Sequence, residues 1–82
     1  MVSQETREFI RRAELVYAQR HKAALENTHQ DSFVAIEPES GDYFLGRTLS
    51  EAAEAAYQIY PDRRTHVIRV GHHVAVHIGG FQ

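Results

Sequence analysis

The segment TLSEAAEAAYQIYPD, residues 48–62, constrains the fold of this chain more than any other. Thr48 is a typical helix N-cap, and Glu51, three residues later, completes a capping box. Pro61 ends the helical pattern, because proline does not continue a helix. Between these signals apolar residues recur at steps of three and four: Leu49, Ala52, Ala53, Ala56, Tyr57 and Tyr60. The pattern predicts a helix whose small alanines let it lie close against a sheet.

Short strands are predicted on both sides of this helix. FVAIE (33–37) and YFLG (43–46) flank a turn-forming run and read as a hairpin. THVIRV (65–70) and HVAVHI (73–78) predict two further strands joined around Gly71. The fold class is therefore α+β: an N-terminal helix followed by a ββαββ two-layer sandwich, with an antiparallel sheet in the order 2-1-3-4.

The N-terminal part differs in pattern from the rest of the chain. Residues 1–27 are predicted to form an amphipathic helical arm, with the helix over 3–26, and residues 32–82 the ββαββ domain, in one compact domain overall. The apolar stripe of the arm contains Phe9, Ala13, Val16, Tyr17 and Ala24. Such a narrow stripe either packs on a core or pairs with a second copy. We expect self-association, most commonly as a symmetric homodimer.

Composition narrows the possible functions. The 82 residues suffice for one small domain, and a hydrophobic content of 43% suits a globular core. Nine basic and eleven acidic side chains give a formal charge of −2, so a nucleic-acid partner is not expected. The absence of cysteine excludes disulfide and thiolate sites. A charged N-terminus and the lack of a run of ~20 apolar residues predict a cytoplasmic protein with no membrane partner.

The segment FVAIEPESGDYFLGRTLSEAAEAA, residues 33–56, resembles part of HicB-type antitoxins. It also resembles a set of small bacterial proteins that share the phrase AIEPESGDYFLG. The matching residues are Tyr43, Phe44, Gly46, Thr48, Leu49, Glu51 and Ala52. The resemblance covers roughly a third of the chain and implies a small, partly ribonuclease-H-like sheet that blocks a toxin partner, often beside a DNA-binding module. No such module is visible after the last predicted strand, and the extra helix precedes the sheet instead.

The C-terminal stretch VGHHVAVHIGG, residues 70–80, contains three of the six histidines. If Gly71 and His72 form a two-residue type II′ turn, His66 faces His77 across the hairpin. Directly opposed Cβ atoms lie ~4.5–5.5 Å apart, so the two imidazoles would touch. Three interpretations stay open: histidines that line a sheet face or an interface, a Zn²⁺ site at His66 and His77 that needs further ligands, and acid–base hydrolysis of RNA.

Two charged groups are interpreted as solvated. Glu37, Glu39 and Asp42 lie in and beside a predicted hairpin loop, and a cation site would need carboxylates from other elements as well. Arg63, Arg64 and Arg69 are close in sequence, but no aromatic or glycine-rich element accompanies them.

The sequence thus predicts a small non-enzymatic protein-interaction module, antitoxin-like or regulatory, that works without a cofactor. A protein partner, or a second copy in a homodimer, is expected to bind at Phe9, Val16, Tyr17, Tyr43 and His73. The alternative is a small metal-dependent or histidine-dependent hydrolase or ribonuclease that uses the C-terminal histidine hairpin, with Zn²⁺ as the candidate cofactor.

Overall fold

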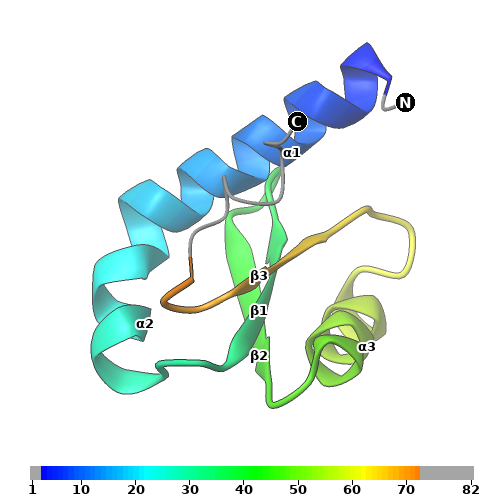
Figure 1. The fold of residues 1–82 in the computed structure, drawn as a ribbon. Helices are drawn as coiled ribbons and strands as arrows, with labels where there is room; N and C mark the ends of the chain where they lie inside the picture. Colours follow the sequence, from blue (N-terminus) through cyan, green and yellow to red (C-terminus); the bar gives the residue numbers. More distant parts are fainter. Residues whose placement is uncertain (1–2, 73–82) are drawn as a thin grey trace.

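The computed structural model describes residues 3–72, while residues 1–2 and 73–82 fall outside the description (Figure 1). In chain order the elements are α1 (Gln4–Val16), the π-helical turn η1 (Tyr17–His21), α2 (Lys22–Thr28), β1 (Phe33–Glu37), β2 (Asp42–Gly46), α3 (Leu49–Ile59) and β3 (His66–Arg69). The α+β class with an N-terminal helix and an antiparallel sheet is confirmed. None of the described helices has the length and apolar content to cross a bilayer.

The three described strands form one antiparallel sheet in the order β2-β1-β3. Ala35 in the central strand pairs with Phe44 of β2 and with Val67 of β3. Because side chains alternate along a strand, these three residues share one face of the sheet, and Val34 and Ile36 belong to the other. The order matches the first three positions of the predicted sheet. The predicted fourth strand, residues 73–78, lies outside the described residues.

The start of α3 carries the predicted N-terminal cap. The Thr48 hydroxyl oxygen accepts a hydrogen bond from the Glu51 N–H at 3.1 Å. The Glu51 carboxylate in turn accepts one from the Arg47 N–H at 2.8 Å, one residue earlier than in a standard capping box. These two bonds fix where the helix begins and how the chain leaves β2.

Small residues bring α3 close to the Ala35 face of the sheet. Ala52 and Ala56 have no exposed surface and pack against Ala35. At the end of β2, a Cβ added to Gly46 would stand 2.4 Å from the Ala52 nitrogen, so a larger residue there would push the helix away. The predicted close approach of an alanine-rich helix to a sheet is confirmed.

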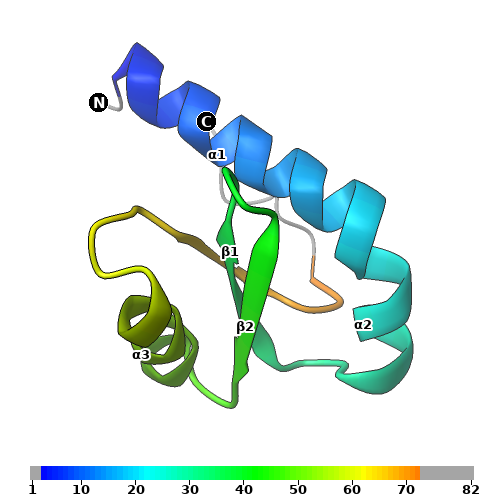
Figure 2. The same cartoon turned by 180° about the vertical axis from the view of Figure 1, so that it is seen from behind.

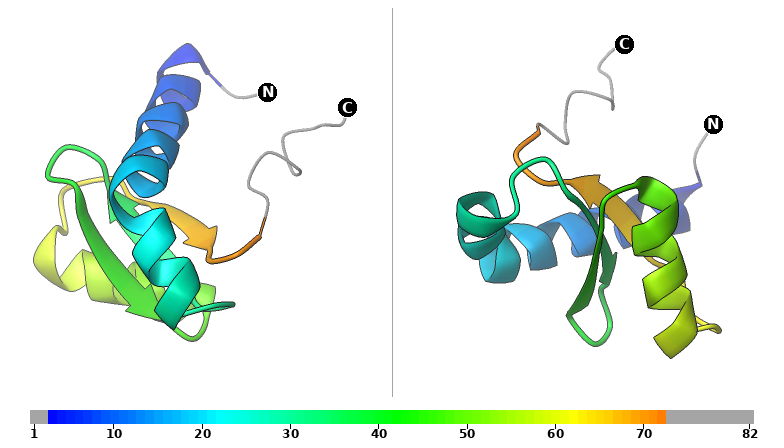
Figure 3. Two further views of the ribbon diagram at one scale, coloured as in Figure 1. Left: turned by 90° about the vertical axis from the view of Figure 1, so that its left-hand side faces the viewer. Right: turned by 90° about the horizontal axis from the view of Figure 1, so that it is seen from below.

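The N-terminal helical segment covers the opposite face of the sheet, so the two helical parts enclose the sheet between them (Figure 3). The core on this side consists of Ala13, Tyr17, Leu25, Val34, Ile36, Ile68 and Val70. The predicted two-layer arrangement therefore needs a correction, because the arm adds a third layer. The reason lies in β1: Val34, Ala35 and Ile36 are consecutive and apolar, so both faces of the central strand need cover.

The π-helical turn η1 changes which residues of the arm face the sheet. The turn closes where the Lys22 N–H donates to the Tyr17 carbonyl, five residues back. A π turn accommodates one more residue than an α turn and shifts the stripe that follows it. The buried stripe consequently runs from Ala13 and Tyr17 to Leu25. The prediction that Ala24 belongs to this stripe was wrong, since Ala24 is exposed.

The turn after β3 is also displaced from its predicted position. The His72 N–H donates to the Arg69 carbonyl at 3.2 Å, which makes Val70 and Gly71 the central residues of a four-residue turn. Gly71 has a φ of 86°, as the third position of a type II turn requires. The prediction had placed Gly71 and His72 at the centre. The predicted pairing of His66 with His77 depended on that position, and His77 lies outside the described residues.

Candidate protein-binding surface

The residues of the arm that were predicted to bind a partner serve largely in the core. Tyr17 is buried in the core over the sheet, and Val16 packs against the same cluster. Phe9 lies nearer the surface, with the Arg64 guanidinium 4.3 Å from its ring centre. Arg64 also donates to the Thr6 hydroxyl at 3.3 Å, which ties α1 to the turn before β3. The apolar stripe of the arm therefore contacts the sheet of its own chain.

Tyr43 is the predicted partner-binding residue that the structure leaves open to solvent. It lies on β2 with 43% of its surface exposed. Its ring is 4.5 Å from the His21 ring, and the His21 Nε2–H donates to the Gly41 carbonyl at 2.9 Å. His73, the last residue of the predicted set, lies outside the described residues. Tyr43 is thus held in place from one side and exposed on the other.

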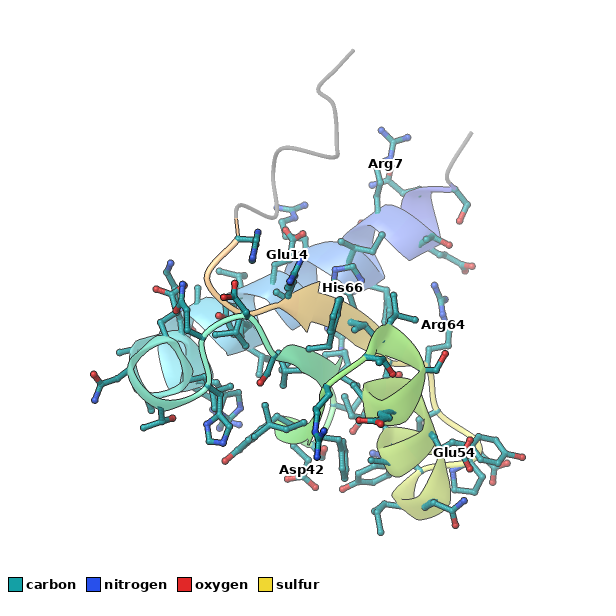
Figure 4. The ribbon with its side chains drawn as sticks, turned by 60° about the horizontal axis from the view of Figure 1, so that its bottom comes forward. Arg7, Glu14, Asp42, Glu54, Arg64 and His66 are labelled. Atoms are coloured by element: carbon teal, nitrogen blue, oxygen red, sulfur yellow. The ribbon has the colours of Figure 1, made fainter. Side chains whose placement is uncertain are left out.

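The described histidines contact different parts of the molecule. His66 lies on β3 beneath α1, where its Nε2 is 3.9 Å from the Glu14 carboxylate (Figure 4). His72 contacts Asp31 instead, with its Nε2 2.9 Å from a carboxylate oxygen. Within residues 3–72, no three histidine or carboxylate side chains gather in a way that could hold a metal ion. His77, the second predicted ligand, lies outside this range.

The acidic hairpin loop is organised around the buried carboxylate of Glu37, which is 1% exposed. The N–H groups of Glu39 and Ser40 donate to this carboxylate at 3.0 and 2.8 Å. The Arg63 guanidinium donates to it at 3.0 Å from the turn after α3. The expectation that these acids are merely solvated is therefore wrong for Glu37. Its carboxylate accepts hydrogen bonds from loop N–H groups in place of backbone carbonyl acceptors.

Hydrogen bonding decides the ionisation of Glu37. Burial by itself favours the neutral acid, but the donors on Ser40, Glu39 and Arg63 outweigh it and hold the pKa of Glu37 below its ordinary value. The same contact raises the pKa of the Arg63 guanidinium. Arg63 also stacks over the Tyr60 ring, 5.1 Å from its centre. The expectation that Arg63 is merely solvated was therefore wrong, because its guanidinium is bonded to the buried Glu37. Its partner is distant in the chain, and no local pattern marks the pair.

A polar cleft of about 390 Å³ lies between the start of α1, the hairpin loop and the turn before β3. Its lining includes both acidic and basic side chains, among them Arg12, Glu39 and Asp62. Glu37 and Arg63, which also line it, are bonded to each other, and Arg64 contacts Phe9. The side chains that line this cleft thus include those whose contacts hold α1, the hairpin loop and the turn before β3 together.

A second hollow of about 470 Å³, the α3 groove, follows the outer flank of α3 toward the start of β3. Leu49, Ala53 and Tyr57 form its floor at intervals of four residues along the helix. Leu49 is 55% exposed and Tyr57 is 61% exposed. Polar residues border it: Ser50, Glu54, Arg63 and Thr65. An apolar strip with a polar margin is the usual composition of a protein-binding surface.

The α3 groove exists because α3 is seated mainly over β1 and β2 rather than over β3. The sequence pattern had placed Leu49 and Tyr57 on the sheet-facing side of the helix, which was wrong for both. Ala52 and Ala56 bring the helix axis so close to the sheet that the contact is narrow. Larger side chains on the flank then project beyond it.

Comparison with known proteins gives no guide to this surface. No protein-family model, no curated protein and no solved structure matches the chain.

Proposed function

We propose that the protein is a small non-enzymatic interaction module whose α3 groove receives an apolar segment of a protein partner. The observation that carries this proposal is the exposure of Leu49 and Tyr57 on one continuous hollow. A tyrosine beside aliphatic side chains is the type of anchor that interface centres favour, because it offers a large contact area and a hydroxyl. Glu54 and Arg63 at the margin supply charges of both signs for orienting the partner.

The more specific form of the proposal is an antitoxin-like or regulatory role in the cytoplasm, with a toxin as the partner. Its support is the resemblance of residues 33–56 to HicB-type antitoxins. Gly46, Thr48, Glu51 and Ala52 in that segment fix the start and the seat of α3, and Leu49 lies on the groove. The segment that carries the resemblance thus contributes part of the proposed surface, while Tyr57, Arg63 and Thr65 lie beyond it.

The fourth strand belongs to the same proposal. We propose that residues 73–78 pair with β3 and complete the order 2-1-3-4. β3 has β1 on one side, and no described strand pairs with its other side. HVAVHI has the alternating pattern that such an edge would accept.

A capture experiment with matched variants tests the groove. The tagged protein, expressed in its native host, should retain a partner that Tyr57→Glu loses, because a carboxylate would be buried in an apolar contact. Gln58→Glu is the control, since residue 58 is exposed on the neighbouring side of the same helix and outside the groove. Equal capture by both variants would refute the groove. Thermal melts of both confirm that the fold is intact.

A further inference from the structure

The outer edge of β2 is uncovered in the described part of the molecule. β2 is the terminal strand of the described sheet and packs chiefly against β1 and α3. Figure 2 shows it at the front of the sheet, with α1, α2 and α3 set to the sides. An uncovered edge strand offers a row of backbone N–H and C=O groups to a further strand, and proteins usually protect such edges with lysine, proline or bulges. The strand Asp42–Gly46 contains neither residue, and its pairing with β1 is regular.

Exposed apolar side chains flank this edge on both faces of the sheet. Tyr43 is exposed on the α1 side of β2. On the other side, α3 carries Ile59, which is 60% exposed and lies on the flank away from the α3 groove. Phe44 between them is partly buried, with the Tyr60 ring 6.0 Å away. The edge therefore offers apolar contacts in addition to hydrogen bonds.

We infer that this edge binds the β2 strand of a second copy, antiparallel and about a two-fold axis at Phe44. In this register Phe44 faces its own copy, Tyr43 faces Leu45 of the second copy, and Asp42 faces Gly46 of the second copy. The pairs are apolar against apolar at the centre, and no like charges oppose each other. Two three-stranded sheets would become one continuous sheet.

The distribution of charge along β2 favours pairing with a second copy of the strand, in the antiparallel direction and not the parallel one. Asp42 begins β2, Glu39 lies in the loop before it, and Arg47 follows its end. Antiparallel pairing sets the acidic end of each copy beside the basic end of the other, so both ends gain opposite charges. Arg47 also comes diagonal to Tyr43 of the second copy on the same face, within reach of its ring. This inference does not depend on the α3 groove.

Single cysteines test the register, because the chain has no cysteine of its own. Phe44→Cys should form an intermolecular disulfide under mild oxidation, since the two Cβ atoms would be directly opposed across the axis. Gln58→Cys, on the exposed side of α3, should not. Tyr43→Cys gives a second measurement if Phe44→Cys fails to fold. Residue 43 would lie diagonal to its own copy at ~7–8 Å, which a short bismaleimide bridges.

Sedimentation velocity of the unmodified chain completes the test. The sedimentation coefficient should rise from the monomer toward the dimer value with concentration, and Tyr43→Lys should weaken the dimer about tenfold, because the change occurs twice in a symmetric pair. A chain that stays monomeric at millimolar concentration would overturn the inference. So would cross-linking at residue 44 that is no faster than at residue 58. If a heterologous partner is lost on Tyr43→Lys while the chain remains monomeric, the edge belongs to that partner instead of a second copy.

Discussion

Arg63 donates to the buried carboxylate of Glu37 at 3.0 Å and thereby joins the end of β1 to the turn that follows α3. The two residues are separated by 26 positions in the chain. Glu37 is almost entirely enclosed, whereas 44% of the Arg63 side chain is exposed. The pair thus links the hairpin loop, α3 and β3 through one carboxylate, and it makes the stability of the fold depend on the ionisation of that group.

Glu37→Gln is expected to lower the free energy of unfolding by about 1–3 kcal/mol, because charged hydrogen bonds to Arg63 and the loop amides weaken. The partial exposure of Arg63 keeps the value below that of a fully buried ion pair. Urea denaturation measures the change. Glu39→Gln is the control: this carboxylate is mostly exposed and 3.9 Å from the Arg63 Nε, so its loss should cost less than about 0.5 kcal/mol. Equal effects would contradict the central place given to Glu37.

The pKa of Glu37 predicts a dependence of stability on acid. Because the folded-state pKa is below the ordinary value of 4.5, the unfolded chain takes up the proton first as the medium acidifies. The stabilisation from Glu37 is full above the unfolded-state pKa and is lost as the pH falls through the folded-state pKa. Unfolding free energies measured across this range should converge for the native chain and Glu37→Gln. Parallel curves would show that Glu37 is not the group responsible.

The π-helical turn predicts a sharp contrast between adjacent positions. Leu25→Ala should destabilise the protein by about 2–5 kcal/mol, since Leu25 is buried between the arm and the sheet. Ala24→Ser should change stability by less than about 0.5 kcal/mol, because Ala24 is exposed. Thermal or urea unfolding of the two variants decides the matter. A larger effect at residue 24 would mean that the arm continues as a regular α-helix.

The position of α3 on the sheet predicts that substitutions of Ala56 and Ala53 differ in their effect on stability. Ala56→Leu should overpack the contact with the sheet and cost about 1–3 kcal/mol, because Ala56 has no exposed surface. Ala53→Leu should be tolerated, since Ala53 lines the open α3 groove. The melting temperatures of the two variants provide the comparison. If Ala53→Leu were the more damaging change, the groove would have to be closed in solution.

Zinc distinguishes the interaction module from the hydrolase alternative. We expect micromolar Zn²⁺ to leave the melting temperature unchanged, because the interaction module proposed above needs no metal ion. A rise in melting temperature that His66→Ala abolishes would instead support a metal site on the C-terminal hairpin. His29→Ala serves as the control, since this exposed histidine lies in the linker before β1.

Local signals account for what the sequence predicted well. The cap at Thr48 and the hairpin of β1 and β2 depend on neighbouring residues. The return of β3 beside β1 joins distant residues, and its place in the three-strand order follows from the handedness of the crossover. Whether the arm packs on the core or pairs with a second copy stayed open, because its apolar stripe does not reveal what it packs against. The π turn was missed because its benefit, the burial of Leu25, arises only in the tertiary structure.

The candidate surface was harder to predict than the fold. Tyr57 and Leu49 fit a helical apolar face by spacing, and only the narrow contact through Ala52 and Ala56 shows that they stay outside. No local pattern marked Arg63 as the partner of Glu37, which is 26 positions away in the chain. Tyr43 was predicted as a binding residue and is exposed, but its binding role stays a prediction.

Because of the π turn, we expect the arm to tolerate the deletion of one residue. Removal of Ala18, an exposed residue inside the turn, would leave one residue fewer between Tyr17 and Leu25 and allow an unbroken α-helix. The remaining helix would carry Leu25 to the position that regular spacing assigns to residue 24, still facing the sheet. A deletion in the middle of a regular α-helix would rotate the following residues away from the core. Here it would leave Leu25 facing the sheet.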